Sequence, residues 1–296
     1  MPAPPQDARS RSASVVRCTP CGADAFVLEL DPGEELAPVR ASRFFMLRRE
    51  DGTSPLIPRP FSLYRQRRGN LEFLIKVMGA GTQALVNAPP GSKMRLIGPL
   101  GNGWPAIDGD GPDWVMLAGG VGSAPFWMGI EQALGGMDGK RPARRNQVHL
   151  LLGAATSGLL YDLAGFQELG APVHAATMDG SCGHQGHVLS LLAQLQATAK
   201  VPQRVRLLAC GPERMLEAAS HLALERGWDA WLSMETWMGC GVGICNGCPI
   251  PTRAQGPRAA WPNVKCCVEG PVFHVREVDL ERRVSAAEMA CSPAAS

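Results

Sequence analysis

Three cysteines in the C-terminal part of the chain have the spacing of metal ligands. Cys240, Cys245 and Cys248 are separated by four and then two residues, and an adjacent pair, Cys266 and Cys267, follows after a longer gap. Plant-type [2Fe–2S] clusters are held by thiolates with this C-x4-C-x2-C…C pattern. A four-cysteine zinc site is the alternative, although such sites usually pair two C-x2-C knuckles. The pattern therefore predicts a protein that transfers single electrons.

The residues between these cysteines fit the same interpretation. Gly241, Gly243 and Gly247 allow backbone conformations that other residues avoid, so a short loop can wrap an inorganic core. Backbone amides directed at the sulfur atoms would also tune the reduction potential of a cluster.

A first motif that could bind phosphate lies in the N-terminal half. Arg59, in the stretch Arg-Pro-Phe-Ser, is expected to point out of a strand. There its planar guanidinium group can bind a pyrophosphate through two parallel hydrogen bonds. Gly81 and Thr82 precede a short apolar stretch whose free N–H groups would complete an anion site. Ser62 could hydrogen-bond the polar edge of a flavin ring. A plain surface charge is the alternative for Arg59.

A second phosphate-binding motif comes later, between an expected strand and an expected helix. The stretch 119–125, Gly-Gly-Val-Gly-Ser-Ala-Pro, differs from the G-x-G-x-x-G fingerprint, but its glycines allow close approach of a phosphate to a helix N-terminus. Cys210 ends another strand, where open α/β sheets bind ligands, and its thiol could lie against a nicotinamide ring. An ordinary βα turn and a simply buried cysteine are the alternatives.

Composition restricts the classes of function. The chain has 296 residues, enough for two or three domains, with 45% hydrophobic and 19% charged residues. A net charge of +2 gives no reason to expect nucleic acid as a partner. No apolar run approaches about 18 residues, and the first residues lack the apolar core of a signal peptide, so we expect no membrane span and a cytoplasmic protein. There, ten cysteines favour thiolate ligation over disulfides.

The order of expected elements predicts a multi-domain protein. Short strands with Gly and Pro between them predict an antiparallel β-barrel over residues 15–108. Alternating strands and helices predict an α/β domain with a parallel sheet over residues 109–233, and the cysteine segment forms a small third domain over residues 234–284. Residues 1–14 and 285–296 are expected to be disordered tails.

The chain resembles the electron-transfer subunits of NAD-dependent, two-subunit dihydroorotate dehydrogenases, within the ferredoxin-reductase superfamily. The similarity runs from about residue 25 to residue 279 and includes the motifs above. Its most specific signatures are Gly98-Pro-Leu-Gly-Asn102 and Cys267-Val-Glu-Gly-Pro-Val-Phe273, whereas the nucleotide motifs are shared across the superfamily.

The resemblance implies three cofactors and assigns residues to them. FAD is expected in the barrel, on Arg59, Pro60, Phe61, Ser62, Leu74, Ile75, Lys76, Gly81 and Thr82. NAD(H) is expected at the parallel sheet, on Gly120, Gly122, Pro125, Cys210, Gly211 and Pro212. The [2Fe–2S] cluster is expected on Cys240, Cys245, Cys248 and Cys267, the last chosen because the family cysteine stands directly before x-x-Gly-Pro.

The resemblance also implies a partner. Such subunits form a hetero-oligomer with a catalytic, FMN-containing dehydrogenase of pyrimidine biosynthesis, and electrons from dihydroorotate pass through FMN, the cluster and FAD to NAD+. Binding residues are expected rather than catalytic ones, because the protein needs no general base for its own step. The alternatives are a ferredoxin-reductase-like subunit serving a different redox partner, and a non-catalytic module that binds zinc.

Departures from the family pattern bear on the nucleotide and the partner. Residues 40–44 replace the usual Pro-Gly-Gln-Phe at one edge of the barrel, and residues 153–155 lack the usual arginine, which leaves the choice between NAD and NADP open. The proline-rich loop 249–266 could face a partner. Asp179 and His184 are expected to be turn or nucleotide-contact residues, and the isolated pair Cys18, Cys21 a loop beside the first strand.

Overall fold

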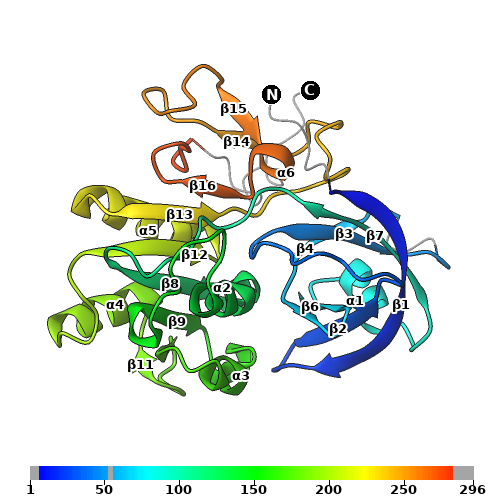
Figure 1. Cartoon of the computed structure of the whole chain (residues 1–296), viewed down its shortest axis with the longest axis horizontal. Helices are drawn as coiled ribbons and strands as arrows, with labels where there is room; N and C mark the ends of the chain where they lie inside the picture. The colour runs from blue at the N-terminus through cyan, green and yellow to red at the C-terminus, as the bar shows by residue number, and fades with distance from the viewer. Residues whose placement is uncertain (1–6, 53–55, 283–296) are drawn as a thin grey trace, which may run out of the picture.

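The computed structural model describes residues 7–52 and 56–282, which form three packed units (Figure 1). The N-terminal unit is an antiparallel sheet that curls into a half-barrel, with one short helix, α1 (Ala80–Val86). Its strands are β1 (Arg9–Pro20), β2 (Ala25–Asp31), β3 (Phe44–Arg49), β4 (Arg59–Ser62), β5 (Arg65–Arg67), β6 (Asn70–Lys76) and β7 (Lys93–Leu100), in the order β4-β3-β7-β1-β2-β6-β5.

The inside of the half-barrel is filled by large apolar side chains. Phe45 of β3 and Phe73 of β6 meet edge to face with ring centroids 5.7 Å apart, and Leu28 of β2 is fully buried beside them in the same core. Such aromatic pairs add stabilisation beyond the area that they bury. The predicted antiparallel unit is therefore present, as an incompletely closed barrel.

The N-terminal prediction was wrong for residues 9–14. These residues begin β1, which pairs with β7 on one side and β2 on the other and so lies within the sheet. Only Ala13 and Val15 of β1 are buried, and most of its other side chains are polar and largely face solvent. A segment with so few apolar residues has the composition of a disordered tail. Its extended conformation comes from pairing with β2 and β7, which the local sequence does not show. The predicted tail 285–296, with Cys291, lies outside the described residues.

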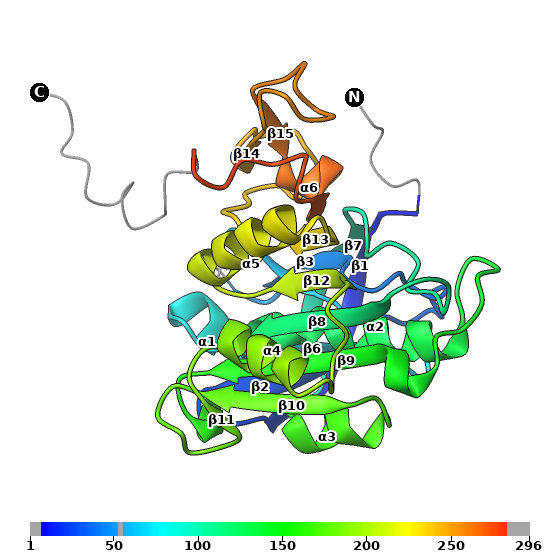
Figure 2. The same cartoon turned by 90° about the vertical axis from the view of Figure 1, so that its left-hand side faces the viewer.

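The second unit is a parallel sheet with helices on both faces. Its strands are β8 (Asp113–Gly119), β9 (Val148–Ala154), β10 (Val173–Thr177), β11 (His184–Gln185), β12 (Val205–Cys210) and β13 (Asp229–Ser233). Helices α2 (Ala124–Gly135) and α3 (Leu163–Glu168) lie between the sheet and the half-barrel, while α4 (Val188–Ala197) and α5 (Glu213–Arg226) cover the opposite face (Figure 2). Burial on both faces explains the continuous apolar runs in the central strands.

The cysteine segment is the third unit, and it is tied to the second. It contains β14 (Pro249–Pro251), β15 (Asn263–Lys265) and α6 (Cys266–Glu269), and ends in β16 (Val272–His274). Strand β16 pairs antiparallel with β13, giving the sheet order β11-β10-β9-β8-β12-β13-β16. The segment expected to be a separate domain thus supplies the edge strand of the nucleotide-type sheet.

A buried polar cluster joins the half-barrel to the parallel-sheet unit. Tyr64 donates a hydrogen bond to Asp162, and Arg65 forms an ion pair with the same carboxylate. The Arg65 guanidinium also stacks over the Trp127 ring of α2, 3.7 Å from the ring centroid. Burial raises the pKa of Tyr64, so this hydroxyl remains protonated and keeps donating. We call Tyr64, Arg65 and Asp162 the interdomain latch.

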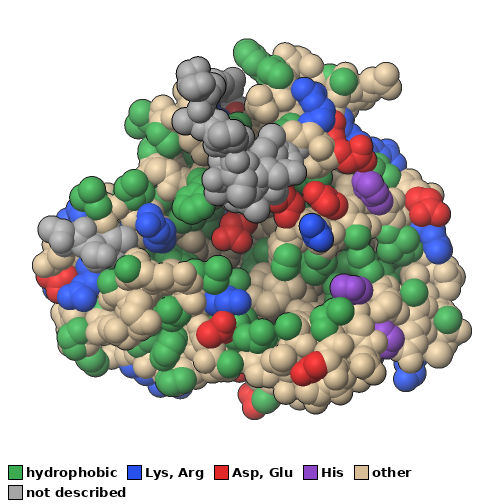
Figure 3. Space-filling model, turned by 180° about the vertical axis from the view of Figure 1, so that it is seen from behind, with side chains coloured by type: hydrophobic (Ala, Val, Ile, Leu, Met, Phe, Trp, Pro, Cys, Tyr) green, Lys and Arg blue, Asp and Glu red, His purple; other side chains and the backbone are tan. Residues whose placement is uncertain are grey.

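The described residues on the face in Figure 3 carry no strong charge of one sign. On the face in Figure 3, Lys and Arg side chains are interspersed with Asp and Glu, as the net charge of +2 suggests. Within the part of the chain that the structure describes, no helix has both the length and the apolar character needed to cross a bilayer.

Candidate functional site

Two of the four predicted cluster cysteines are brought together by a hairpin. Strands β14 and β15 pair antiparallel, and the amide of Cys266 continues the ladder by donating to the carbonyl of Cys248 at 2.9 Å. This places the sulfur atoms of Cys248 and Cys267 3.3 Å apart. The contact lowers the pKa of Cys248 to about 6 and raises that of Cys267. Cys248 is thus prepared to act as a thiolate ligand.

The other two cysteines form a second pair in the preceding loop. The amides of Val242 and Cys245 lie 3.4 Å and 3.5 Å from the sulfur of Cys240, and the amide of Gly247 lies 3.4 Å from that of Cys245. Burial acts to raise the pKa of Cys240, but the hydrogen bonds from Cys245 and Val242 outweigh it and lower the pKa to about 7. Amides directed at the sulfurs are the arrangement expected around a cluster.

The glycines of this loop are required by close packing as well as by backbone conformation. Gly241 has a φ of +72°, and a Cβ there would lie 2.6 Å from the side chain of Met46 on β3. Gly243 has a φ of +84°, and a Cβ there would lie 2.7 Å from Val268 of α6. The loop that contains Gly241 and Gly243 therefore packs closely against the half-barrel on one side and α6 on the other.

The two adjacent cysteines of α6 face different surroundings. Cys267 contacts Cys248, whereas the buried sulfur of Cys266 lies 3.5 Å from the carbonyl of Met234. This arrangement supports Cys267 as the fourth ligand, which stays a prediction.

The sulfur positions can be tested against the expected cluster. Among residues 7–52 and 56–282, no three His, Cys, Asp or Glu side chains are grouped so as to hold a metal ion. The thiols form two pairs, Cys240 with Cys245 and Cys248 with Cys267. A [2Fe–2S] cluster takes four thiolates on two irons, so two pairs fit it better than one tetrahedral zinc ion.

The two predicted nucleotide motifs lie directly against each other. They sit at the carboxyl ends of β8 and β12, which are neighbours in the sheet. A Cβ on Gly122 would lie 2.3 Å from the carbonyl oxygen of Cys210, and one on Gly119 would lie 2.5 Å from Pro212. Gly119 and Gly122 therefore allow the backbone of residues 210–212 to pack closely against them. The sequence indicated only that these glycines allow a phosphate to approach, and it did not predict this packing role.

Unused polar groups remain beside this contact. Residues 120–123 form a 3-10 turn that leads into α2, with Pro125 in the first helical turn. The hydroxyl of Ser123 is buried there without a hydrogen-bond partner in the described structure. Gly120 has a φ of +53°, and nothing lies within 4 Å of where its Cβ would be. An open backbone at a helix N-terminus fits the phosphates of a dinucleotide.

Cys210 lies in a chain of small polar side chains at the junction of the three units. Its thiol contacts the hydroxyl of Ser233, which lies 2.9 Å from that of Ser42 on the half-barrel. Burial and the charge of Glu235 raise the pKa of Cys210 to about 12, although the Ser233 hydrogen bond opposes them. The thiol is therefore neutral and provides a packing surface, not a nucleophile.

The predicted flavin residues share one edge of the half-barrel. Arg59 to Ser62 form β4, in which every residue is half-buried. The Arg59 guanidinium donates to the carbonyl of Ile57 at 3.0 Å and makes no ion pair within the described residues, so it is free to meet a phosphate. Strand β4 therefore offers a partly open surface with an unpaired cation, as a flavin nucleotide requires.

The other predicted flavin residues differ in what they can offer. Leu74 and Ile75 are buried in the core, so only their backbone could contact a cofactor. Lys76 lies 3.4 Å from Asp24. The Thr82 hydroxyl accepts hydrogen bonds from the amides of Met78 and Gly79, which precede α1, and so fixes the start of that helix. The anion site assigned to the first amides of α1 stays a prediction.

Of the residues expected to have ordinary roles, Asp179 makes a turn, whereas Cys18 lies within strand β1 and not in the predicted loop. Asp179 accepts hydrogen bonds from the amide and hydroxyl of Ser181, which makes a turn and lowers the pKa of Asp179. His184 is hydrogen-bonded to Ser190 at 2.9 Å. Cys18 and Cys21 are free thiols whose pKa is raised by burial.

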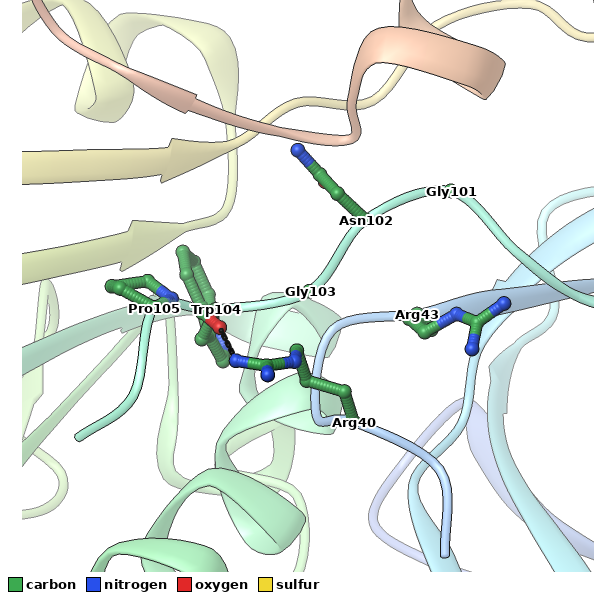
Figure 4. Close-up of a pocket in the computed structure, with 7 residues that line it drawn as sticks. All are labelled: Arg40, Arg43, Gly101, Asn102, Gly103, Trp104 and Pro105. Carbon is green, nitrogen blue, oxygen red and sulfur yellow. Dashed lines mark hydrogen bonds between the residues drawn. The ribbon is translucent and has the colours of Figure 1, made fainter. Parts of the chain in front are cut away.

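Two cavities lie away from these sites. One, of about 430 Å3, opens where the three units meet (Figure 4). Its two guanidinium groups are already paired, Arg40 with Asp138 and Arg43 with Asp7, and it is lined by Arg40, Arg43, Gly101, Asn102, Gly103, Trp104 and Pro105. The other, of about 670 Å3, lies beside β10 and α4 at the outer edge of the sheet. Neither is lined by a predicted flavin or cluster residue.

Comparison with known families supports two of the three units. Residues 235–279 match the iron–sulfur cluster binding domain of dihydroorotate dehydrogenase B. Residues 116–221 match the oxidoreductase NAD-binding domain. These ranges contain the four predicted cluster cysteines and both nucleotide motifs.

Full-length relatives identify the family. The dihydroorotate dehydrogenase B (NAD(+)) electron transfer subunit of Desulforamulus reducens is 30% identical over 252 residues, covering 84% of this chain and 90% of the relative. That of Geobacillus thermodenitrificans is 32% identical over 241 residues, covering 80% and 86%. The chain belongs to the dihydroorotate dehydrogenase B electron transfer subunit family.

Solved structures show that the fold of this electron transfer subunit is shared more widely. An NADH-dependent reduced ferredoxin-NADP oxidoreductase has a TM-score of 0.73 and 24% identity over 91% of this chain and 90% of its own. A ferredoxin NADP+ reductase from Neisseria gonorrhoeae, with bound FAD and NADP, has a TM-score of 0.58 and 19% identity over 74% and 92%. The ferredoxin-reductase fold is thus established.

One departure from the family pattern acquires a structural role. Ser42, within the stretch that replaces Pro-Gly-Gln-Phe, has a φ of +71° and is fully buried. Its hydroxyl meets Ser233, and the neighbouring Arg43 donates to the carbonyl of Pro99 at 2.6 Å. In this electron transfer subunit the altered stretch therefore ties the half-barrel to the end of β13.

Proposed function

We propose that this chain relays electrons between a catalytic flavoprotein dehydrogenase and NAD(H), through a [2Fe–2S] cluster and FAD. The partner proposed is an FMN-containing dihydroorotate dehydrogenase of pyrimidine biosynthesis, in a cytoplasmic hetero-oligomer. Membership of the electron transfer subunit family supports the assignment.

The observation that carries this proposal is the place of the half-barrel between the other two sites. Its strands β3 and β7 contact the cysteine loop, since Met46 and Leu100 lie under Gly241. Its Ser42 reaches the end of β13 beside Cys210. A flavin on β4 would therefore lie between a nucleotide and a cluster, the order that an electron relay needs.

In this proposal the side chains and backbone of the protein bind and orient FAD and NAD(H). Bound FAD converts a two-electron hydride transfer into single-electron steps. Arg59 neutralises phosphate, the backbone from Gly119 to Gly122 accommodates the dinucleotide, and the neutral thiol of Cys210 provides an uncharged surface.

The cysteine loop is the proposed point at which electrons pass between the catalytic partner and this chain. Cys245 is exposed, and the neighbouring Ile244 is 80% exposed. Trp237 and Trp261 of the same unit are 71% and 64% exposed. Exposed tryptophans are enriched where proteins bind one another, so this unit is the proposed contact for the catalytic partner.

The test is to purify the native complex and assay it. We expect copurification with an FMN-containing subunit, visible absorption from flavin and an iron–sulfur cluster, and reduction of NAD+ by dihydroorotate. Copurification with a different flavin or iron–sulfur dehydrogenase would show that the proposed partner is wrong but would leave the proposed electron-transfer function intact. A colourless protein that contains only zinc would refute the redox function.

A further inference from the structure

A single side chain bridges the half-barrel and the segment that carries Cys267. Asn102 follows β7, and its amide group donates to the carbonyls of Glu269 and Val272 at 3.0 Å and 2.7 Å. Its carbonyl oxygen accepts from the amide of Val272 at 2.9 Å. Figure 4 shows this side chain directed away from the cavity, towards the segment that leads into β16.

The backbone around Asn102 makes the same connection. The amide of Asn102 donates to the carbonyl of Gly270 at 2.6 Å. A Cβ on Gly101 would lie 2.6 Å from Pro271, so only glycine allows this approach. Gly101 also has a φ of +68°, which glycine adopts without strain.

This contact lies where the half-barrel meets the segment that follows Cys267. Residues 269–272 come directly after Cys267, and Leu100 at the end of β7 packs beneath Gly241 of the cysteine loop. Both ends of the cysteine segment are therefore held against β7 and the turn that follows it. Asn102 touches no predicted ligand of FAD or of the cluster.

We propose that Asn102 is a positioning residue that fixes the cluster-bearing segment on the flavin half-barrel and so sets the rate of electron transfer between flavin and cluster. The inference rests on the proposed function. Asn102 is partly exposed, so water can replace some of its hydrogen bonds, but water cannot fix the segment. Loss of three hydrogen bonds is expected to increase local opening about tenfold.

The experiment uses the holoprotein and two variants. Asn102→Ala removes all three side-chain hydrogen bonds, and Asn102→Asp keeps the size and the bond accepted from Val272. Asn70→Ala is the control, since Asn70 donates to Glu29 on the half-barrel at 2.7 Å and contacts nothing in the cysteine segment. Stopped-flow absorption with NADH follows flavin reduction and cluster reduction separately. Hydrogen exchange of residues 263–272, iron content and the electron paramagnetic resonance (EPR) spectrum after dithionite reduction are measured on the same samples.

The expected result separates positioning from folding. Flavin reduction by NADH, iron content and the EPR spectrum should be unchanged, while cluster reduction slows about tenfold in Asn102→Ala and at least as much in Asn102→Asp, whose carboxylate meets the carbonyls of Glu269 and Val272. Hydrogen exchange of residues 263–272 should rise in both variants and not in the control.

Other results would overturn the inference. Unchanged cluster reduction would show that Asn102 does not set the rate, and loss of iron from both variants would show a purely structural role. A parent protein that lacks flavin or cluster would instead refute the proposed function.

Discussion

At the scale of single residues, the adjacent cysteines of α6 have different neighbours and should behave differently. Cys267 lies 3.3 Å from Cys248, whereas Cys266 faces the carbonyl of Met234. We expect Cys267→Ser to lose most of the bound iron and the visible absorption of the cluster, because one thiolate ligand is removed.

The neighbouring substitution is the matched control. A serine at Cys266 can donate to the Met234 carbonyl, so Cys266→Ser should keep its iron. Iron content and visible absorption of the two purified variants show which cysteine binds the cluster. Equal loss of iron from both variants would contradict the assignment of Cys267 as the fourth ligand.

Residue types could be predicted from the sequence better than residue contacts. Cysteine spacing was enough to predict a cluster loop, and the structure brings those sulfurs together in two pairs. The bridge made by Asn102 and the hydroxyl pair of Ser42 and Ser233 join residues more than a hundred positions apart. No local pattern encodes such contacts, because they depend on how complete units pack.

At the scale of elements, the interdomain latch holds the half-barrel on the parallel-sheet unit. Asp162→Asn should lower the free energy of unfolding by about 2 kcal/mol, because Arg65 loses its closer carboxylate partner and keeps Glu72, at 3.3 Å, as its acidic partner. Asp162 has a φ of +53°, which asparagine also tolerates, so the change tests charge without adding backbone strain. Urea titration followed by tryptophan fluorescence measures the difference.

An exposed pair between the same two units provides the comparison. Arg40 pairs with Asp138, whose side chain is 48% exposed. Asp138→Asn should therefore change the free energy of unfolding by less than about 1 kcal/mol, since solvent screens such pairs. A loss as large as that of Asp162→Asn would show that burial of the latch is unimportant.

The elements themselves were predictable where apolar residues were dense. The central strands β8, β9 and β12 are rich in apolar residues, which is the pattern of strands buried on both faces. Strand β1 could not be recognised in the sequence because most of its side chains are polar. Strand β16 is only three residues long and owes its extended conformation to pairing with β13. Strand β4 ends at Ser62, and the amide of Tyr64 turns to donate to the carbonyl of Glu72.

At the scale of the whole molecule, the proposed relay should be separable into two halves. Cys245→Ala removes a proposed cluster ligand in a loop that is separate in sequence from β4 and from the nucleotide motifs, and Cys245 is exposed. We expect NADH-to-dye activity through FAD to survive within about twofold, because hydride transfer does not use the cluster, while transfer to the catalytic partner stops.

Dye reduction and partner-linked NAD+ reduction are measured on the same preparation of Cys245→Ala, with its flavin content as the check. Loss of FAD from this variant would argue against separate cofactor units. Persistent transfer to the partner would show that electrons bypass the cluster.

The pairing of β16 with β13 has a consequence for how the protein is made. Ser233 and Val272 are neighbours in the sheet, yet the entire cysteine segment is synthesised between them. The edge of β13 therefore stays open until the ribosome has passed residue 274. All four proposed ligands have left the peptidyl-transferase centre by then, so the same short strand that completes the sheet also closes the segment in which iron must be assembled.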